Sequence, residues 1–177
     1  MGEQLENIID FTLTYNQYKR QLFNYTIKMV NDRLTCEDII QNVFLKLFEN
    51  LNRIRNNDSI QCWLFSTVRN EIYSYYRKKK VRIDQYGSED TDEVEIESQH
   101  HIENEYDNKE MKEIIINELN KMAIEQREVF LLKEYGGLSY KEIADVMKID
   151  EELVKSRLFK TRQKLIRKLS KLFFENP

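Results

Sequence analysis

The stretch LSYKEIADVMKIDEELVKSR, residues 138–157, has the pattern of two short helices joined by a tight turn. Ser139 is followed three residues later by Glu142, which is a capping-box signature and predicts the start of the first helix. The turn is predicted at Lys148–Asp150, and Asp150 is a suitable N-cap for the second helix. These features together predict a helix-turn-helix, a motif whose second helix typically enters the DNA major groove.

The second helix of this motif has one apolar side and a strongly basic remainder. Its apolar stripe repeats every three or four residues, as expected for an α-helix with one buried face. The stripe consists of Val154, Leu158, Thr161, Leu165, Leu169 and Leu172. Between residues 153 and 171 there are eight basic residues and no acidic one. Such cations can neutralise DNA phosphates, which supports the nucleic-acid interpretation.

The composition of the whole chain indicates an all-α protein with short connections. Its 177 residues include only four glycines and one proline, at position 177, so few residues interrupt helices. No apolar run approaches the ~18 residues needed to cross a bilayer. The N-terminus lacks the basic and apolar blocks of a signal peptide. We therefore expect a cytoplasmic protein without direct membrane insertion.

Charge divides the chain into three parts. Residues 84–113 contain 12 acidic and 2 basic residues, whereas the remainder has a net charge of +7. We predict a helical domain over residues 1–82, an acidic flexible linker over 83–110, and a smaller helical domain with the helix-turn-helix over 111–177. The overall charge of −3 averages over these parts and does not exclude a nucleic-acid partner.

The first domain contains a predicted helix from about Cys36 to Ile54 with a regular apolar stripe. The stripe consists of Ile40, Val43, Phe44, Leu47, Leu51 and Ile54. Leu45 and Phe48 lie near its polar side, although both are apolar. Two interpretations are open: these residues widen the buried stripe, or they form a docking surface for a partner protein.

A second predicted helix of this domain runs from about Ile60 to Lys80. Its buried side consists of Trp63, Leu64, Val68, Ile72 and Tyr75. A different face carries Arg69, Tyr73, Tyr76 and Lys80 at spacings of 4, 3 and 4, with Arg77, Lys78 and Lys79 alongside. Cations neutralise phosphates, and tyrosines stack on unpaired bases, so this face is suited to opened DNA. The alternative is a solvated charged face whose tyrosines complete the core.

No pattern indicates an active site. The chain has no glycine-rich phosphate loop and no H-E-x-x-H sequence, so we predict neither catalysis nor a cofactor. Cys36, Cys62, His100 and His101 lack the spacing of a zinc site. Buried free thiols and a solvated histidine pair are the simpler interpretation, and no metal is expected.

The two domains, in this order, resemble bacterial RNA polymerase sigma factors of the sigma-70 family. The resemblance is to the extracytoplasmic-function (ECF) type, which carries only regions 2 and 4. EDIIQNVFLKL (37–47) resembles the helix that binds the polymerase core. WLFSTVRN (63–70) and YSYYRK (73–78) resemble the stretch that melts and reads the −10 element. QREVFLL (126–132), GLSYKEIA (137–144) and VKSR (154–157) resemble the region that reads the −35 element.

The resemblance implies a non-enzymatic transcription initiation factor that binds core RNA polymerase and directs it to promoters. It would recognise and open the −10 element and read the −35 element. Implied core-binding residues, which would contact the clamp helices of the largest subunit, are Asp38, Gln41, Asn42, Phe44, Leu45 and Phe48. Implied −10 residues are Asn56, Asn57 and Asp58, as the pocket for an everted base, with Arg69, Asn70, Tyr73, Tyr76, Arg77, Lys78 and Lys80. Implied −35 residues are Glu152, Lys155, Ser156, Arg157, Lys160, Arg162, Gln163 and Lys164. The C-terminal domain would also contact the polymerase flap.

Several positions depart from the family pattern. Asn42 stands where the core-binding helix usually has glutamate, and Ala123 stands where a proline usually opens region 4. Lys148 replaces the common turn glycine, which predicts either a left-handed residue or a different turn. Glu151 and Glu152 begin the recognition helix, where they favour the helix dipole but oppose phosphates. A glutamate there can accept a hydrogen bond from cytosine N4, which suggests a −35 element that contains cytosine.

Some functional alternatives are open from the sequence. In this family the linker threads the RNA exit path, but a simple solvated tether also fits its composition. An anti-sigma protein, or another regulatory or recruiting protein, is an expected partner. Two other functions are alternatives to that of a sigma factor. One is an autonomous helix-turn-helix regulator that binds its operator as a dimer, and the other is a sigma-like decoy that does not direct transcription.

Overall fold

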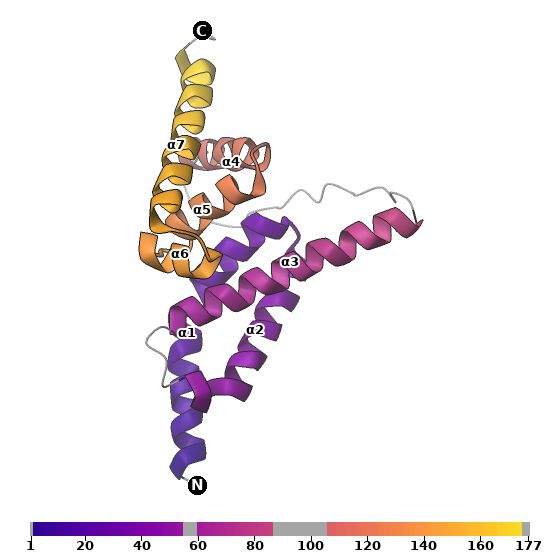
Figure 1. Ribbon diagram of the computed structural model, residues 1–177, viewed down its shortest axis with the longest axis vertical. Coiled ribbons are helices and arrows are strands. Elements are labelled where there is room, and N and C mark those ends of the chain that lie inside the picture. Colours follow the sequence, from indigo (N-terminus) through magenta and orange to yellow (C-terminus); the bar gives the residue numbers. More distant parts are fainter. Residues whose placement is uncertain (1, 55–59, 87–105, 175–177) are drawn as a thin grey trace. The chain divides into compact units, whose positions relative to one another are not determined.

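The computed structural model describes residues 2–54, 60–86 and 106–174, and within these ranges it consists of α-helices and turns without a strand. The helices are α1 (Gly2–Val30), α2 (Arg33–Ile54), α3 (Ile60–Tyr86), α4 (Tyr106–Asn120), α5 (Ile124–Glu134), α6 (Tyr140–Met147) and α7 (Glu151–Phe174) (Figure 1). The prediction of an all-α fold is therefore confirmed.

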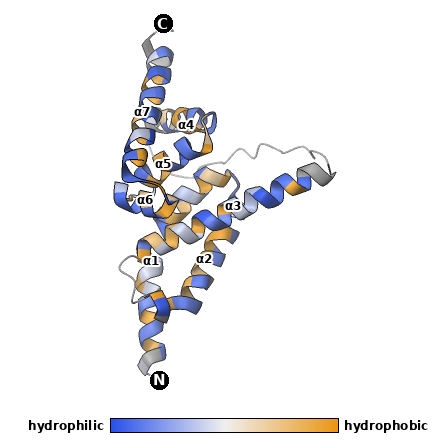
Figure 2. Ribbon diagram, viewed as in Figure 1, coloured by the Kyte–Doolittle hydropathy of each residue, from blue (hydrophilic) through white to orange (hydrophobic). Residues whose placement is uncertain are grey.

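The helices belong to two compact units. The N-terminal unit contains α1, α2 and α3, each of which packs on the other two. In the C-terminal unit α4, α5 and α7 pack together, and the short α6 connects α5 to α7 in sequence. Hydrophilic residues predominate in the C-terminal half of α3 (Figure 2). Regularly spaced apolar residues occur instead where α1, α2 and the first half of α3 pack on one another.

The junction between α1 and α2 is set by two adjacent polar residues. Asn31 takes a left-handed conformation with φ of 53°, which ends α1, because asparagine tolerates this region better than most residues. Asp32 then caps α2, since the Thr35 amide donates to its Oδ2 at 2.8 Å. Hydrogen bonds from Thr35 lower the pKa of the Asp32 carboxyl. The carboxylate therefore stays ionised at neutral pH and complements the N-terminal dipole of α2.

The core of the N-terminal unit is formed by the facing sides of its three helices. Tyr25 of α1 and Phe65 of α3 are fully buried, with ring centroids 5.8 Å apart. The other fully buried side chains of this unit include Leu22, Thr26, Met29, Cys36, Val43, Leu47, Leu64, Val68 and Ile72. This arrangement confirms most of the predicted stripes of α2 and α3. Ile40, Trp63 and Tyr75 are only partly buried, however, and Ile39 and Phe65 are additional core residues.

The core of the C-terminal unit lies between α5 and α7. Val129 and Leu132 of α5 are fully buried, as are Val154 and Thr161 of α7. Thr161 is the polar member of the predicted α7 stripe, and its hydroxyl donates to the Arg157 carbonyl at 2.8 Å. This bond lets a polar side chain be buried without an unsatisfied hydroxyl.

The predicted linker is shortened at both ends by helix. α3 continues to Tyr86, and α4 begins at Tyr106, so residues 83–86 and 106–110 are helical rather than irregular. No glycine or proline interrupts α3 before Gly87, so the helix can propagate beyond its packed section. Residues 87–105, including the predicted histidine pair, lie outside the described residues.

Candidate nucleic-acid and partner interfaces

The predicted helix-turn-helix is formed by α6, a tight turn and α7. The Ser139 hydroxyl accepts from the Glu142 amide at 3.2 Å, and the Ser139 amide donates to the Glu142 carboxylate at 2.7 Å. Both halves of the capping box are thus present. Lys148 ends α6 with φ of 55° and ψ of 51°, and the Ile149 amide donates to the Ala144 carbonyl at 3.1 Å. Of the two predicted turns, the structure therefore contains the left-handed one.

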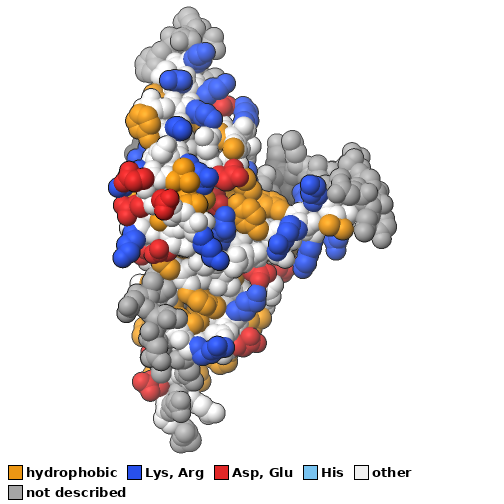
Figure 3. Space-filling view, viewed as in Figure 1, with side chains coloured by type: hydrophobic (Ala, Val, Ile, Leu, Met, Phe, Trp, Pro, Cys, Tyr) orange, Lys and Arg blue, Asp and Glu red, His pale blue; other side chains and the backbone are white. Residues whose placement is uncertain are grey.

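The predicted −35 residues lie on the sides of α7 that do not face the core. Arg157 and Gln163 are half-buried, and the others are exposed. The exposed members are Glu152, Lys155, Ser156, Lys160, Arg162 and Lys164. Lysine and arginine side chains gather along this helix in the space-filling view (Figure 3). An exposed, mostly cationic helix that follows a tight turn has the geometry that major-groove recognition requires.

Three of these cations already bind acceptors within the protein. The Lys155 ammonium lies 2.9 Å from Glu152 and 3.3 Å from Glu151. Its hydrogen bond to the Glu152 carboxylate is the main reason that the pKa of Lys155 is raised. The remaining two cations contact α5. Arg162 donates to Glu134 at 2.6 Å, which raises the Arg162 pKa, and Lys164 donates to the Gln126 side chain at 2.9 Å. Phosphate binding by these residues would have to compete with those acceptors.

The predicted −10 surface on α3 combines half-buried aromatic residues with exposed cations. The guanidinium of Arg69 lies 4.6 Å from the ring centroid of Tyr73, which packs edge-on against Tyr76 at 6.4 Å. The Tyr76 hydroxyl donates to the Met29 carbonyl of α1. Asn70, Arg77, Lys78, Lys79 and Lys80 are exposed. Tyr76 therefore helps to hold α3 on α1, as the core interpretation predicted, while the cations that directly follow it face solvent.

The proposed base pocket at Asn56, Asn57 and Asp58 lies outside the described residues.

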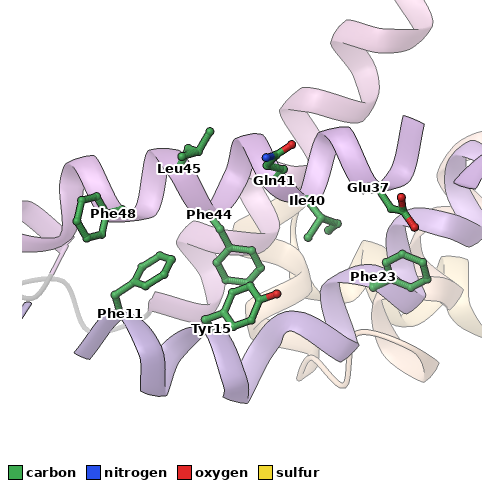
Figure 4. Close-up of a pocket in the computed structure, with 9 residues that line it drawn as sticks. All are labelled: Phe11, Tyr15, Phe23, Glu37, Ile40, Gln41, Phe44, Leu45 and Phe48. Carbon is green, nitrogen blue, oxygen red and sulfur yellow. The ribbon is translucent and has the colours of Figure 1, made fainter. Parts of the chain in front are cut away.

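A groove between α1 and α2 includes most of the predicted core-binding residues. It forms a cavity of about 510 Å³. Its lining residues are Phe11, Tyr15, Phe23, Glu37, Ile40, Gln41, Phe44, Leu45 and Phe48 (Figure 4). Asp38, Gln41 and Asn42 are exposed on the same helix. The groove is largely apolar, which suits a protein partner better than nucleic acid.

The structure separates the apolar residues of α2 into two roles. Leu45 and Phe48 are 55% and 53% exposed. The interpretation that they widen the buried stripe is therefore wrong. Phe44, by contrast, is only 4% exposed and is a core residue that forms the floor of the groove. Its place within the apolar stripe already indicated burial. A partner could reach the ring edge only from within the groove.

The α1 side of this groove was not predicted from the sequence. Phe11 packs edge-on against Phe48 at 5.4 Å, and Tyr15 packs against Phe44 at 4.6 Å between centroids. Two aromatics four residues apart indicate one face of a helix, so the signal was present in the sequence. What the spacing could not indicate was which helix this face would contact.

The two cysteines are free thiols; Cys36 is buried as predicted, whereas Cys62 is only half-buried. Burial raises the pKa of the Cys36 thiol to about 12, and Glu37 and Asp32 add to the effect. The thiol therefore remains protonated and unreactive at neutral pH. Among the described residues, no group of three or more histidine, cysteine or acidic side chains could hold a metal ion.

Comparison with known proteins identifies both units. The family model described as Sigma-70 region 2 matches residues 14–82, and the one described as Sigma-70, region 4 matches residues 112–165. Together they cover more than half of the chain. The chain belongs to the sigma-70 family. It is a sigma factor of the ECF type, a transcription initiation factor that directs RNA polymerase to promoters, and it is not an enzyme.

Relatives of this sigma factor extend over nearly its whole length. It is 26% identical to the ECF RNA polymerase sigma factor SigM of Bacillus subtilis, over 85% of this chain and 90% of that protein. It is 29% identical to the RNA polymerase sigma factor SigZ of the same organism, over 85% of this chain and 82% of that protein. The fold matches that of the sigma factor RpoE, solved in complex with the anti-sigma factor NepR from Bartonella quintana. The TM-score is 0.77 at 22% identity, and the match covers 91% of this chain and 97% of that one.

Within the parts of this sigma factor that the structure describes, no helix is both long and apolar enough to cross a membrane.

Proposed function

We propose that three surfaces divide the work of promoter recognition in this sigma factor. The exposed residues of α2 and the groove beside them bind the polymerase core, on the clamp helices of its largest subunit. The basic face of α3 binds the opened −10 element, and the exposed face of α7 reads the −35 element. The C-terminal unit also contacts the polymerase flap. The corresponding domains are residues 1–82 and 111–177, joined by the acidic segment at 83–110.

The observation that carries this proposal is the chemical contrast between the surfaces. The α2 surface presents Leu45 and Phe48 beside an apolar groove, which is typical of a protein interface. The other two surfaces present rows of exposed lysine and arginine, which is typical of phosphate binding. Half-buried tyrosines accompany the cations only on α3, and aromatic rings are suited to unpaired bases rather than to a closed duplex.

On α7, a few residues are candidates for base contacts, while the remaining cations contact phosphates. Glu152 is 85% exposed at the start of the helix, the part nearest to base edges. Its carboxylate can accept from cytosine N4, so we propose a cytosine in the −35 element. Band-shift assays that replace each cytosine by thymine would show unchanged affinity at every position if this idea is wrong.

Two further proposals concern the setting in which this sigma factor acts. Its site of action is the cytoplasm, where promoter DNA and polymerase are found. An anti-sigma protein is a candidate regulator, because the structurally similar RpoE was solved in complex with one. The acidic segment at 83–110 serves either as a strand in the RNA exit path or as a tether. Replacing its acidic residues by serine would leave core affinity and promoter escape unchanged if it is only a tether.

The decisive experiment mixes the purified protein with core RNA polymerase from its host and assays run-off transcription on fragmented host DNA. Discrete new transcripts are the expected result, and their start sites would define the promoter sequence. Stable core binding without transcripts would instead indicate a decoy or a missing recruiter. Tight duplex binding without core binding would indicate the autonomous regulator.

A further inference from the structure

Phe159 is an aromatic residue on the side of α7 that faces away from the core. Its side chain is 64% exposed, whereas Val154 and Leu158, which face the core, are 0% and 2% exposed. Glu152, Ser156 and Phe159 recur at spacings of 4 and 3 residues, so they share one side of the helix. Glu152 and Ser156 are also exposed. Phe159 therefore lies among the residues that the proposed function places against DNA.

The surroundings of Phe159 are polar and cationic. Arg157 stands two positions before it and Lys160 directly after it, and residues 153–171 contain eight basic residues and no acidic one. Among residues 154–165, all of which the structure describes, Phe159 is the only exposed apolar side chain. One ring does not supply the apolar centre that a protein interface needs, whereas the cations around it match a row of phosphates. This position favours DNA over a protein as the group that covers the ring.

The chemistry of a phenylalanine ring limits what it can recognise in the major groove. The ring has no hydrogen-bond donor or acceptor, so it cannot pair with the polar groups that the base edges present. The C5-methyl group of thymine is the one apolar group that the four bases present in this groove. Contact between the ring and this methyl removes apolar surface of both groups from water. Thymine is therefore the base that is complementary to Phe159.

We infer that Phe159 selects thymine in the −35 element by packing against its C5-methyl group. This inference rests on the proposed function of α7 and deepens it, because it assigns part of the sequence preference to an apolar contact. Arg157 and Lys160 would hold the duplex beside the ring. Ile166 is 55% exposed but lies seven residues, or about 10 Å, further along the helix, and recognition helices contact bases through their N-terminal part. Ile166 is therefore outside this contact.

Replacement of thymine by deoxyuridine tests the methyl group alone, because uracil keeps the base pairing and the O4 acceptor. The probe is the promoter defined by run-off transcription, bound by the protein together with polymerase core in a band-shift assay. Each thymine of the −35 element, on either strand, is replaced in turn. At one position the replacement should weaken binding by about fourfold, as loss of one buried methyl-sized group implies. Phe159→Ala should bind the thymine and deoxyuridine probes of that position equally, which a double-mutant cycle would measure.

Two variants and a second modified base serve as controls. Ile166→Ala removes an exposed apolar side chain of the same helix and should keep the full preference for thymine. Phe159→Leu keeps an apolar group and should keep most of it. Alanine has the highest helix propensity, so Phe159→Ala should leave α7 intact, and circular dichroism would verify this. In the converse test, 5-methylcytosine at the same position should bind the unchanged protein more tightly than cytosine does, and Phe159→Ala should bind the two equally.

Several outcomes would overturn the inference. Promoter-dependent transcripts combined with equal binding of every thymine and deoxyuridine probe would do so while leaving the proposed function intact. A thymine preference that Phe159→Ala retains would assign the methyl contact to another residue. Weaker binding of Phe159→Ala to polymerase core without DNA, with the thymine preference retained, would assign the ring to polymerase. Absence of transcripts from the unchanged protein would instead overturn the proposed function, and the inference with it.

Discussion

The basic faces of α3 and α7 have similar composition but hold their cations in different ways. On α3, Arg77 to Lys80 form a continuous exposed run beyond the packed part of the helix. On α7, Lys155, Arg162 and Lys164 each bind an acceptor of the same C-terminal unit. A continuous exposed run favours affinity for a flexible single strand, whereas cations held in place by neighbours are positioned for a duplex of fixed shape. Under the proposed function, α3 should therefore dominate salt dependence and α7 should dominate sequence preference.

The largest effect is expected from neutralising the α3 run. Replacing Arg77, Lys78, Lys79 and Lys80 by glutamine should abolish promoter opening, because under the proposed function this run would supply most of the phosphate contacts on the opened strand. The slope of log affinity for single-stranded −10 DNA against log salt should fall by up to about 3. Binding to polymerase core should be unchanged. Potassium permanganate footprinting and salt titrations would measure the two effects.

A matched control removes the same number of charges from other parts of the N-terminal unit. Lys19, Arg20, Arg33 and Arg53 are exposed residues that we assign to no DNA contact. Their combined replacement by glutamine should leave the salt slope nearly intact. An equal fall in slope would mean that net charge, rather than the α3 run, determines binding.

The second effect concerns Arg157 and Lys160 on α7. Each alanine variant should weaken −35 binding by roughly 1–3 kcal/mol if the residue reads a base, and by less, with no dependence on sequence, if it contacts phosphate. Neither variant should alter core binding. Competition assays with mutated −35 duplexes would separate the two cases. If both variants abolished core binding, the division of labour between α2 and α7 would be wrong.

The third effect tests whether the placement of α7 matters more than its charge. Ser139→Ala removes the hydroxyl that caps α6 and should cost about 1 kcal/mol of stability. Because α6 and its turn orient α7, −35 binding should weaken while −10 binding by α3 stays the same. Urea denaturation of the variant and separate binding assays with the two elements would check this. Serine to threonine at the same position keeps a hydroxyl and should largely retain the wild-type behaviour.

Features that depend on residues close in sequence could be predicted, and those that depend on tertiary contacts could not. The capping box and the α7 stripe involve spacings of three or four residues, so the sequence determines them directly. Glu134 and Arg162 are 28 residues apart, and Gln126 and Lys164 are 38 apart. No local pattern pairs them. The α1–α2 groove likewise depends on two helices that meet, so its α1 side, with Phe11 and Tyr15, was not predicted.

The same distinction explains why helices extend into the predicted linker and why Phe44 is buried. The acidic composition of 83–110 indicated disorder. A helix can nevertheless extend into an acidic segment where no glycine or proline stops it and where charges complement the helix dipole. The resemblance placed Phe44 on the core-binding surface, whereas its own spacing placed it in the buried stripe. Phe44 is buried, as its spacing indicated, and it also lines the α1–α2 groove, so its role in core binding stays a prediction.

The smallest effect is expected from releasing one of the held cations. Glu134→Gln removes the carboxylate that binds Arg162, and both side chains are roughly 40–45% exposed. An exposed pair of this kind contributes at most about 1 kcal/mol, so stability should change little. Affinity for −35 DNA should rise by about two- to fivefold, because a negative charge near the phosphates is lost and Arg162 becomes available to them. In an Arg162→Gln background the gain should shrink, since only the long-range charge effect remains. A double-mutant cycle by fluorescence anisotropy at low and high salt would measure this difference. An equal gain in both backgrounds would mean that Arg162 does not contact DNA, and that its ion pair serves only to hold α5 against α7.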